Sequence, residues 1–244
     1  MKISCYTVCY NEEVILPHFI NHYKQFCDKI VIFNHMSTDN TKEIALDNGC
    51  IVHDFDTEGR HDDINLLNIK MNCYREDTDY DWTIVVDSDE FITHKDGIPS
   101  LIKLLEHYKE KDIKVPSVKG YDMFCWDHDF NTPLDNISRA TPNERYSKLA
   151  IFNPKVDMRW DVGCHESSQE PDSYDDLDIP KIILKHYKYI NFEWMSNKNM
   201  EYGKRLSERN LQYGLGWHYL NTKQDWMNRF KELDALVTEK PWEN

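Results

Sequence analysis

A continuous apolar run that ends in a cluster of acids constrains the fold of this chain more than any other feature. Residues 82–86 read Trp-Thr-Ile-Val-Val, and Asp87, Ser88, Asp89 and Glu90 follow at once. An uninterrupted β-branched run predicts a strand buried on both faces, as in the centre of a parallel sheet. Acids at the carboxyl end of such a strand lie where open α/β sheets bind ligands.

The first 110 residues alternate between strand patterns and helix patterns. Such a series requires right-handed crossovers and a parallel sheet. The predicted fold class is therefore α/β, with a central, mostly parallel sheet flanked by helices. The strands are expected over 3–8, 29–33, 51–55 and 82–86, and the helices over 12–27, 41–48, 62–75 and 98–109.

The pattern loosens beyond residue 111. A polar loop over 127–143 separates two of the later strands, and an acidic stretch over 166–178 precedes the last one. The chain then ends in helices, and the last one carries an apolar stripe. We expect this stripe to cover the protein's own core, with a partner or a membrane surface as the alternative. The later strands are expected over 113–124, 146–152 and 179–187, and the final helices over 192–213 and 223–237.

Composition excludes several classes of protein. The 29 basic and 43 acidic residues give a net charge of −14, which argues against nucleic acid as a partner. The seven cysteines are odd in number and scattered, so a disulfide framework or zinc cluster is not expected. A reducing cytosol fits this usage best. The N-terminus does not read as a signal peptide and no run reaches transmembrane length, so we expect a cytoplasmic protein, with peripheral membrane contact left open.

The acidic cluster is a candidate metal site. Asp87 and Asp89 are two residues apart, so they start on the same side of the chain. Carboxylates suit Mg²⁺ or Mn²⁺, which often also hold substrate phosphates. The alternative is a strand that simply ends in a solvated acidic turn.

Three polar segments leave the carboxyl ends of predicted strands, at 10–13, 34–40 and 87–90. Because parallel strands present those ends at one edge, the segments should converge on one crevice. Each segment alone is also compatible with an ordinary strand-to-helix turn, in which Asn11 and Asp39 are good helix caps. Together they favour a nucleotide-type site.

The same segments carry a family resemblance. Val8-Cys9-Tyr10-Asn11-Glu12-Glu13, then Ile32 to Thr41 with Ser37, Asp39 and Thr41, then Val86 to Phe91, resemble glycosyltransferases of family 2 and related GT-A folds. The match covers about the first 95 residues. One departure is that Asn34 and His35 stand where this family often has an acid before the serine. That position bears on recognition of the nucleotide base.

The resemblance implies roles for individual residues. Asp89 would ligate the cation that bridges a diphosphate, while Asp87 would meet the ribose or a water on the metal. His186, in a His-Tyr element at the end of a predicted strand, resembles the residue that completes the metal site in several GT-A enzymes. The nucleotide-sugar would be contacted by Thr7, Tyr10, Asn11, Glu12, His35, Asp39, Arg60, Asp63 and Ser88.

The second half supplies candidates for the chemistry. Glu166 follows a glycine-containing turn and comes after the metal motif, as the base does in inverting members of the family; Asp161 and Asp122 compete with it. His165 is a candidate contact to acceptor or donor, and Lys148 could reach the diphosphate. Each also has an ordinary structural interpretation: Glu166 as the start of a solvated loop, His165 as a satisfied structural histidine and Lys148 as a surface residue.

The resulting expectation is a glycosyltransferase that needs Mn²⁺ or Mg²⁺. It would move a sugar from a nucleotide-sugar, with a UDP-sugar favoured, to a carbohydrate or other hydroxyl acceptor, with inversion. A non-catalytic sugar- or nucleotide-binding module and a sugar-nucleotide nucleotidylyltransferase are the alternatives. We expect a single domain over 1–244, with a nucleotide-binding half at 1–110, an acceptor half at 111–190 and a helical extension at 191–244.

Overall fold

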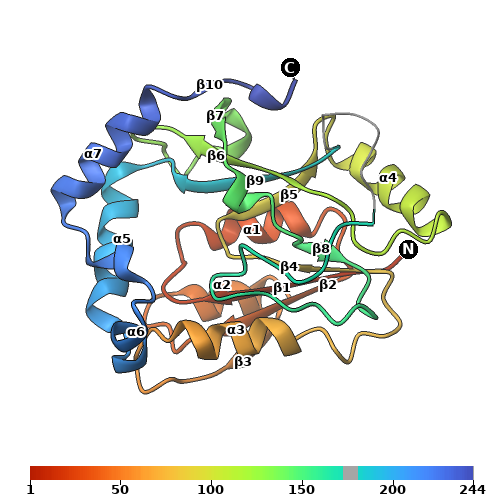
Figure 1. Cartoon of the computed structure of the whole chain (residues 1–244), viewed down its shortest axis with the longest axis horizontal. Helices are drawn as coiled ribbons and strands as arrows, with labels where there is room; N and C mark the ends of the chain where they lie inside the picture. Colours follow the sequence, from red (N-terminus) through yellow and green to blue (C-terminus); the bar gives the residue numbers. More distant parts are fainter. Residues whose placement is uncertain (173–180, 244) are drawn as a thin grey trace.

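The parallel strands expected in the first half form the core of one of two sheets. The computed structural model describes residues 1–172 and 181–243, coloured along the chain in Figure 1. In the first sheet β1 pairs in parallel with β2 and β4, and β2 pairs in parallel with β3, while β8 runs antiparallel to β4 at the edge. The order is β3 (Ile51–Asp54), β2 (Lys29–Asn34), β1 (Ile3–Cys9), β4 (Trp82–Val85) and β8 (Ile151–Phe152).

A second sheet was not expected. Its pairs are antiparallel except for the parallel pair of β6 and β9. The predicted α/β class is confirmed, but the expected central, mostly parallel sheet is only one of two mixed sheets. The second sheet arises because the chain turns after β4. From Glu90 onward it forms a new strand, which pairs with β9. The order is β10 (Thr238–Glu239), β7 (Arg139–Pro142), β6 (Lys119–Phe124), β9 (Ile182–Tyr189) and β5 (Glu90–His94).

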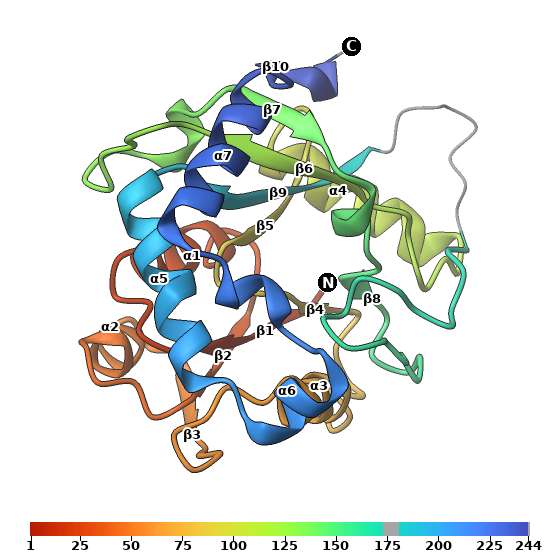
Figure 2. The same cartoon turned by 60° about the vertical axis from the view of Figure 1, so that its left-hand side comes forward.

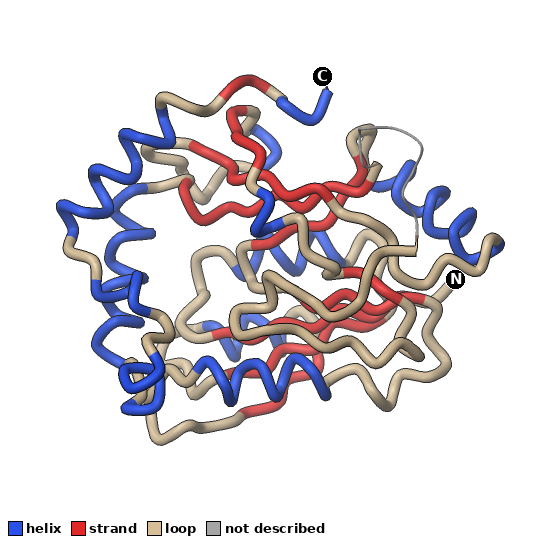
Figure 3. The backbone as a smooth tube through the Cα atoms, in the orientation of Figure 1, coloured by secondary structure: helices blue, strands red, loops and turns tan. Residues whose placement is uncertain are grey.

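The helices lie at the periphery and the strands in the middle (Figure 3). The last three α-helices run along one side of the molecule and pass the ends of both sheets, in both views of the ribbon (Figures 1 and 2). The helices of the first half are α1 (Leu16–Tyr23), α2 (Thr41–Asp47), α3 (Asp63–Asn72) and α4 (Ile98–Glu110); those of the end are α5 (Phe192–Arg205), α6 (Glu208–Tyr213) and α7 (Lys223–Asp234). Short 3₁₀ turns are η1 (Leu134–Asn136), η2 (Glu144–Tyr146), η3 (Trp217–Leu220) and η4 (Pro241–Glu243).

Several predicted boundaries shift for local reasons. The helix expected over 12–27 begins only at Leu16, because Pro17 fits the first turn, where its missing N–H costs nothing. The helix expected over 192–213 is broken at Leu206, and Ser207 caps α6 by accepting a hydrogen bond from the backbone N–H of Asn210.

Two predicted strands are much shorter than expected. The strand expected over 113–124 begins at Lys119, and the one expected over 146–152 is reduced to Ile151–Phe152 because η2 precedes it. The last predicted strand, from 179, is observed from Ile182. Residues 173–180, with part of the acidic stretch, lie outside the described residues.

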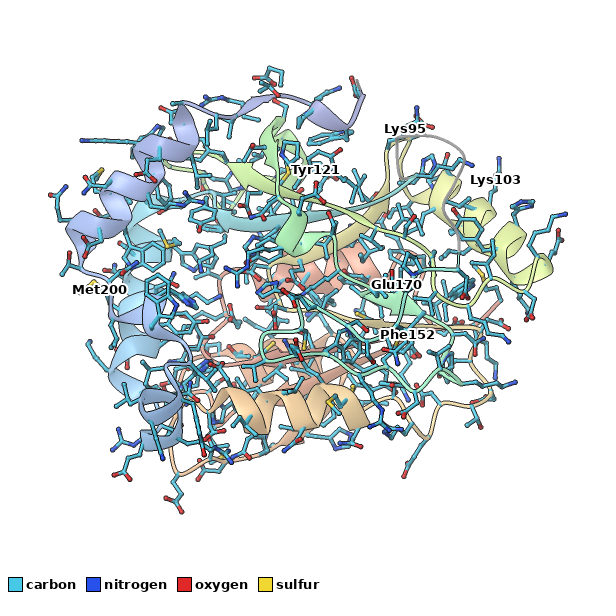
Figure 4. All side chains as sticks on the ribbon, in the orientation of Figure 1. Lys95, Lys103, Tyr121, Phe152, Glu170 and Met200 are labelled. Atoms are coloured by element: carbon cyan, nitrogen blue, oxygen red, sulfur yellow. The ribbon has the colours of Figure 1, made fainter. Side chains whose placement is uncertain are left out.

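Side chains from both sheets fill the interior. Tyr121 on β6 and Phe152 on β8 lie in the body of the molecule, whereas Met200 on α5 lies at its outer side (Figure 4). The stripe expected on α7 is confirmed as core, because Trp226 and Phe230 are buried against Phe124 and neighbouring aromatic residues. All seven cysteines are free thiols. Among the described residues, no helix is both long and apolar enough to cross a membrane.

Candidate functional site

The loops that follow β1 and β2 are joined by hydrogen bonds. The backbone N–H of Thr38 donates to Oδ1 of Asn11 at 2.8 Å, and the N–H of Glu13 donates to Oδ2 of Asp39 at 3.1 Å. Asn11 adopts a φ of 52°, a left-handed conformation that asparagine tolerates well. The expected convergence of these two loops is therefore observed. The polar atoms of Asn11 and Asp39 hold the loops together and, for Asp39, also cap α2 through Thr41.

A cavity of about 650 Å³ lies beside these loops. Its walls come from the ends of β1 and β2, the turn between β4 and β5, strand β9, helices α3, α5 and α7, and the segment 214–221. The predicted residues that line it are Tyr10, Glu12, His35, Asp63, Asp87, Ser88, Asp89, His165 and His186. The predicted residues outside its lining are Thr7, Asn11, Asp39, Arg60, Lys148, Asp161 and Glu166. Among these, Thr7 is buried within β1 and Arg60 is exposed.

Asp89 and His186 lie next to each other in the cavity lining. Nε2 of His186 lies 3.7 Å from Oδ2 of Asp89, and its Nδ1 lies 2.7 Å from Oδ1 of Asp122. Asp122 is buried on β6, directly beside His186 in the parallel pairing with β9. Burial alone would raise the pKa of Asp122, but the hydrogen bonds from His186 and Asn143, together with the attraction of His186 and Lys188, hold this pKa below its usual range. While Nδ1 of His186 faces Asp122, its Nε2 faces Asp89.

Asp87, the first acid of the motif, faces lysines instead. Nζ of Lys70 lies 2.5 Å from Oδ1 of Asp87, and Nζ of Lys148 lies 3.9 Å from Oδ2. Lys148 itself is buried in an ion pair of 2.6 Å with Glu90. Desolvation would raise the pKa of Asp87, but the two lysines outweigh it and hold this pKa well below its usual range. Asp87 is therefore ionised and compensated within the protein.

Of the three residues expected to bind metal, Asp89 and His186 lie together, while Asp87 is paired with Lys70. Within residues 1–172 and 181–243, no three His, Cys, Asp or Glu side chains converge as a ready-made metal site. A divalent cation here would have two protein ligands, and the rest of its coordination shell would come from a bound ligand or water.

Glu12 ties the loop after β1 to the C-terminal helices. Its buried carboxylate accepts hydrogen bonds from Lys198 at 2.8 Å and from the hydroxyl of Tyr202 at 3.3 Å, both on α5. Burial raises the pKa of Glu12, with Lys198 opposing the shift. Next to it, the guanidinium of Arg205 lies 3.2 Å from the ring centroid of Tyr10. The helical end of the chain thus forms one wall of the cavity.

A histidine–aspartate pair lies beside the same helices, with the ring centroid of His61 4.9 Å from that of Tyr202. Nε2 of His61 is 2.9 Å from Oδ1 of Asp63, and Asn210 donates to the other oxygen of Asp63 at 3.0 Å. Asp63 was predicted at this site, whereas His61 was missed. The only feature of the sequence that could have indicated His61 was its position two residues before the start of α3.

The turn that contains the expected base is closed by the backbone. The N–H of Asp161 donates to the carbonyl of Glu166 at 3.1 Å, and Gly163 within the turn has a φ of 88°. Both acids are exposed, while His165 between them turns toward the cavity. Burial lowers the pKa of His165 to about 4, so its ring is neutral near pH 7.

The cavity is rich in basic groups, although the chain is acidic overall. These groups come mostly from parts of the sequence where no motif was recognised. One of them, Lys188, follows His186 by two residues and so lies on the same face of β9. Burial lowers the pKa of Lys188. The basic residues of the lining that sequence reasoning missed are Lys70, Arg145, Lys188, Lys198 and Arg229.

Fold and site together define an α/β protein with a charge-rich cavity at the carboxyl ends of its parallel strands. No family model matches the sequence, and no curated protein matches it.

Solved structures of glucosyl-3-phosphoglycerate synthase from Mycobacterium tuberculosis are similar to part of the chain. The complex with Mn²⁺, UDP and glucosyl-3-phosphoglycerate has a TM-score of 0.32 and 16% identity over 50% of this chain. The complex with phosphoglyceric acid has a TM-score of 0.34 and 18% identity over the same share. Each match spans 44% of that enzyme's chain, so the similarity is distant and partial.

Proposed function

We propose that this protein is a metal-dependent glycosyltransferase that moves a sugar from a nucleotide-sugar, with UDP-sugars favoured, to a hydroxyl acceptor with inversion. The observation that carries the proposal is the group Asp89, His186 and Asp122 on the cavity wall. A carboxylate beside an imidazole, whose other nitrogen is held by a second carboxylate, is a recurrent arrangement of metal ligands and their supporting residues. It lies where open α/β sheets bind ligands.

The residues present fit Mn²⁺ or Mg²⁺. These ions are commonly held by one or two protein ligands together with substrate phosphates and waters, which matches the pair Asp89 and His186. When bound, the cation would supply positive charge to the departing diphosphate. Lys70 lines the same cavity, where its ammonium is paired with Asp87, and it could also donate a hydrogen bond to the diphosphate.

We propose that the nucleoside binds beside Tyr10, His35 and Asp63. All three line the cavity: Tyr10 and His35 lie on the loops that follow β1 and β2, and Asp63 is the first residue of α3. In this proposal Asn11 and Asp39 act by holding these loops in register, and Thr7 lies beneath them in β1. The chain would work as one domain, with residues 1–110 serving the nucleotide, 111–190 the acceptor and 191–244 closing the cavity.

Transfer with inversion needs a base on the acceptor side. The acceptor oxygen forms a bond to the anomeric carbon as the bond from that carbon to the diphosphate oxygen breaks, and the acceptor proton passes to a carboxylate. We propose Glu166 for this role, with Asp161 as its competitor, because their turn presents His165 to the cavity. The turn would have to bring Glu166 to the acceptor when ligands bind.

Nucleotide binding tests the proposal directly. Isothermal titration calorimetry with UDP and GDP, in Mn²⁺ and after chelation, should give binding of at least one nucleotide that weakens when the metal is removed. The variant Asp89→Asn should lose the metal-dependent part of this affinity while remaining folded. The control is Asp47→Asn, an exposed acid at the end of α2.

Equal metal dependence in Asp89→Asn and wild type would contradict the site. Catalysis is tested separately, by following release of nucleotide diphosphate from UDP-sugars without acceptor. Slow release is expected from an enzyme, because water replaces the acceptor at a low rate. Binding without any release would instead favour a sugar- or nucleotide-binding module.

A further inference from the structure

Two hydrogen-bond donors in the cavity wall lack acceptors within the described part of the chain. Trp226 on α7 is buried, and none of the described residues accepts a hydrogen bond from its Nε1. Lys188 on β9 places its Nζ 5.3 Å from the centroid of the Trp226 ring. Among the described residues, no carboxylate lies within ion-pair distance of Lys188. A buried donor without an acceptor costs free energy, so such a pair points to an absent ligand.

The neighbours of Lys188 hold it without neutralising it. The rings of Tyr189 and Tyr219 have their centroids 5.9 Å from its Nζ, so the ammonium rests among three aromatic residues. Cation–π contacts stabilise a cation but leave its hydrogen-bond donors free for a ligand. Arg229, one turn after Trp226 on α7, also lines the cavity. Its carboxylate partner, Glu232, is 3.4 Å away on the exposed surface.

We propose that Lys188, Trp226 and Arg229, here called the Lys188 cluster, bind an anionic group of the acceptor, a phosphate or a carboxylate. An oxyanion can accept from an ammonium, an indole N–H and a guanidinium at once. A bound oxyanion would thereby supply a hydrogen-bond acceptor for Nε1 of Trp226.

The assignment to the acceptor rests on the proposed function. The nucleoside is expected beside Tyr10 and His35, on loops of the first sheet, whereas Lys188 lies on β9 of the second sheet. Trp226 packs with Phe124, Tyr189 and Phe192, a core group that joins α7 to that second sheet. The Lys188 cluster is thus carried by the second sheet and by α7, and not by the loops of the first sheet.

The indole N–H of Trp226 provides the probe. Seven tryptophans give seven indole signals in a ¹H–¹⁵N spectrum, and Trp226→Phe identifies the one from Trp226. Sodium phosphate and sodium acetate are titrated separately at constant ionic strength, with saturating UDP and diamagnetic Mg²⁺ present. We expect one of these anions to shift the Trp226 signal in a saturable way, and the responding anion tells a phosphate from a carboxylate.

Variants and competition decide the outcome. Lys188→Met should weaken the anion's effect on Trp226 at least about tenfold, because a charge-assisted contact is lost. Lys204→Met, whose side chain is 70% exposed on α5, should leave the titration unchanged. The proposal is overturned if neither anion shifts Trp226 selectively, or if Lys188→Met titrates like the wild type.

UDP separates the acceptor from the donor. If either anion shifts Trp226 in the free protein but not with UDP and Mg²⁺ bound, the Lys188 cluster holds the donor's diphosphate and the acceptor assignment is wrong. If no nucleotide diphosphate binds the wild type at all, the proposed function fails. The anion titration of the free protein then decides by itself whether the cluster is an anion site.

Discussion

Nδ1 of His186 lies 2.7 Å from Oδ1 of Asp122, although the two residues are 64 positions apart in the sequence. The parallel pairing of β6 and β9 brings them side by side, and the ring of Tyr146 stacks on His186 with 3.8 Å between centroids. The imidazole is thus fixed in position and in orientation. Its free Nε2 points toward Asp89, and this geometry supports the proposed metal site.

Replacing Asp122 by Asn tests that arrangement. The amide cannot serve both His186 and Asn143, which donates to the second oxygen of Asp122 at 2.7 Å. We expect the affinity for Mn²⁺ in the presence of UDP to fall by about 10–100-fold, as for other supporting residues of metal sites. Calorimetry measures this change. The control is Asp135→Asn, whose side chain is 85% exposed. An unchanged affinity for Mn²⁺ in Asp122→Asn would refute the role of Asp122.

Lys148 is expected to matter for stability. Its side chain is 2% exposed and pairs with Glu90, which is 1% exposed. Lys148→Met leaves a buried carboxylate without its partner, which typically costs about 3–5 kcal/mol of the free energy of unfolding. Urea unfolding measures this loss. Lys155→Met, an exposed lysine nearby, should have little effect.

A second substitution identifies the cause of that loss. The double variant Lys148→Met with Glu90→Gln should be more stable than Lys148→Met alone, because the uncompensated charge is gone. A double variant that is no more stable would mean that lost packing, and not charge, explains the effect.

Stability should fall between pH 6.5 and pH 4. Burial lowers the pKa of His35 from 6.5 to about 4, so the unfolded chain takes up a proton in this range before the folded protein does. The stabilisation is complete above pH 6.5 and is lost as the pH falls toward 4, by about 3 kcal/mol for a shift of this size. Urea unfolding at several pH values measures the slope.

His35→Gln should reduce that slope, even if its overall stability is lower. Burial raises the pKa of Glu12, and this shift makes the protein more stable as the pH falls. The slope of the variant is therefore compared with that of the wild type. His107→Gln, at an exposed position in α4, is the control. Identical slopes for His35→Gln and wild type would refute the prediction.

Glu166→Gln tests the proposed base. If Glu166 takes the acceptor's proton, transfer should fall by about 10²–10⁴-fold while the affinity for nucleotide is unchanged. Product formation is followed with UDP-sugars and a panel of sugar acceptors. Asp161→Asn is compared in parallel, and loss of transfer in that variant alone would assign the base to Asp161.

The sequence by itself determined the first, parallel sheet and the meeting of the loops that follow it. Strands β2 and β4 contain local apolar runs, and parallel strands necessarily present their carboxyl ends at one edge. The contact of Asn11 with Thr38 follows from that geometry. Local pattern and a general rule of parallel sheets were sufficient here.

Only the tertiary structure decided the second sheet and most of the cavity's charge. The pairing of β5 with β9 joins residues more than 80 positions apart. A local sequence pattern does not indicate which distant strand will become the partner. For the same reason, the pattern of residues 87–90 predicted Asp87 as a ligand but could not reveal its pairing with Lys70 on α3. Lys188 and Trp226 likewise become neighbours only when α7 packs on β9. Long-range packing selects these partners, and a local sequence pattern does not record it.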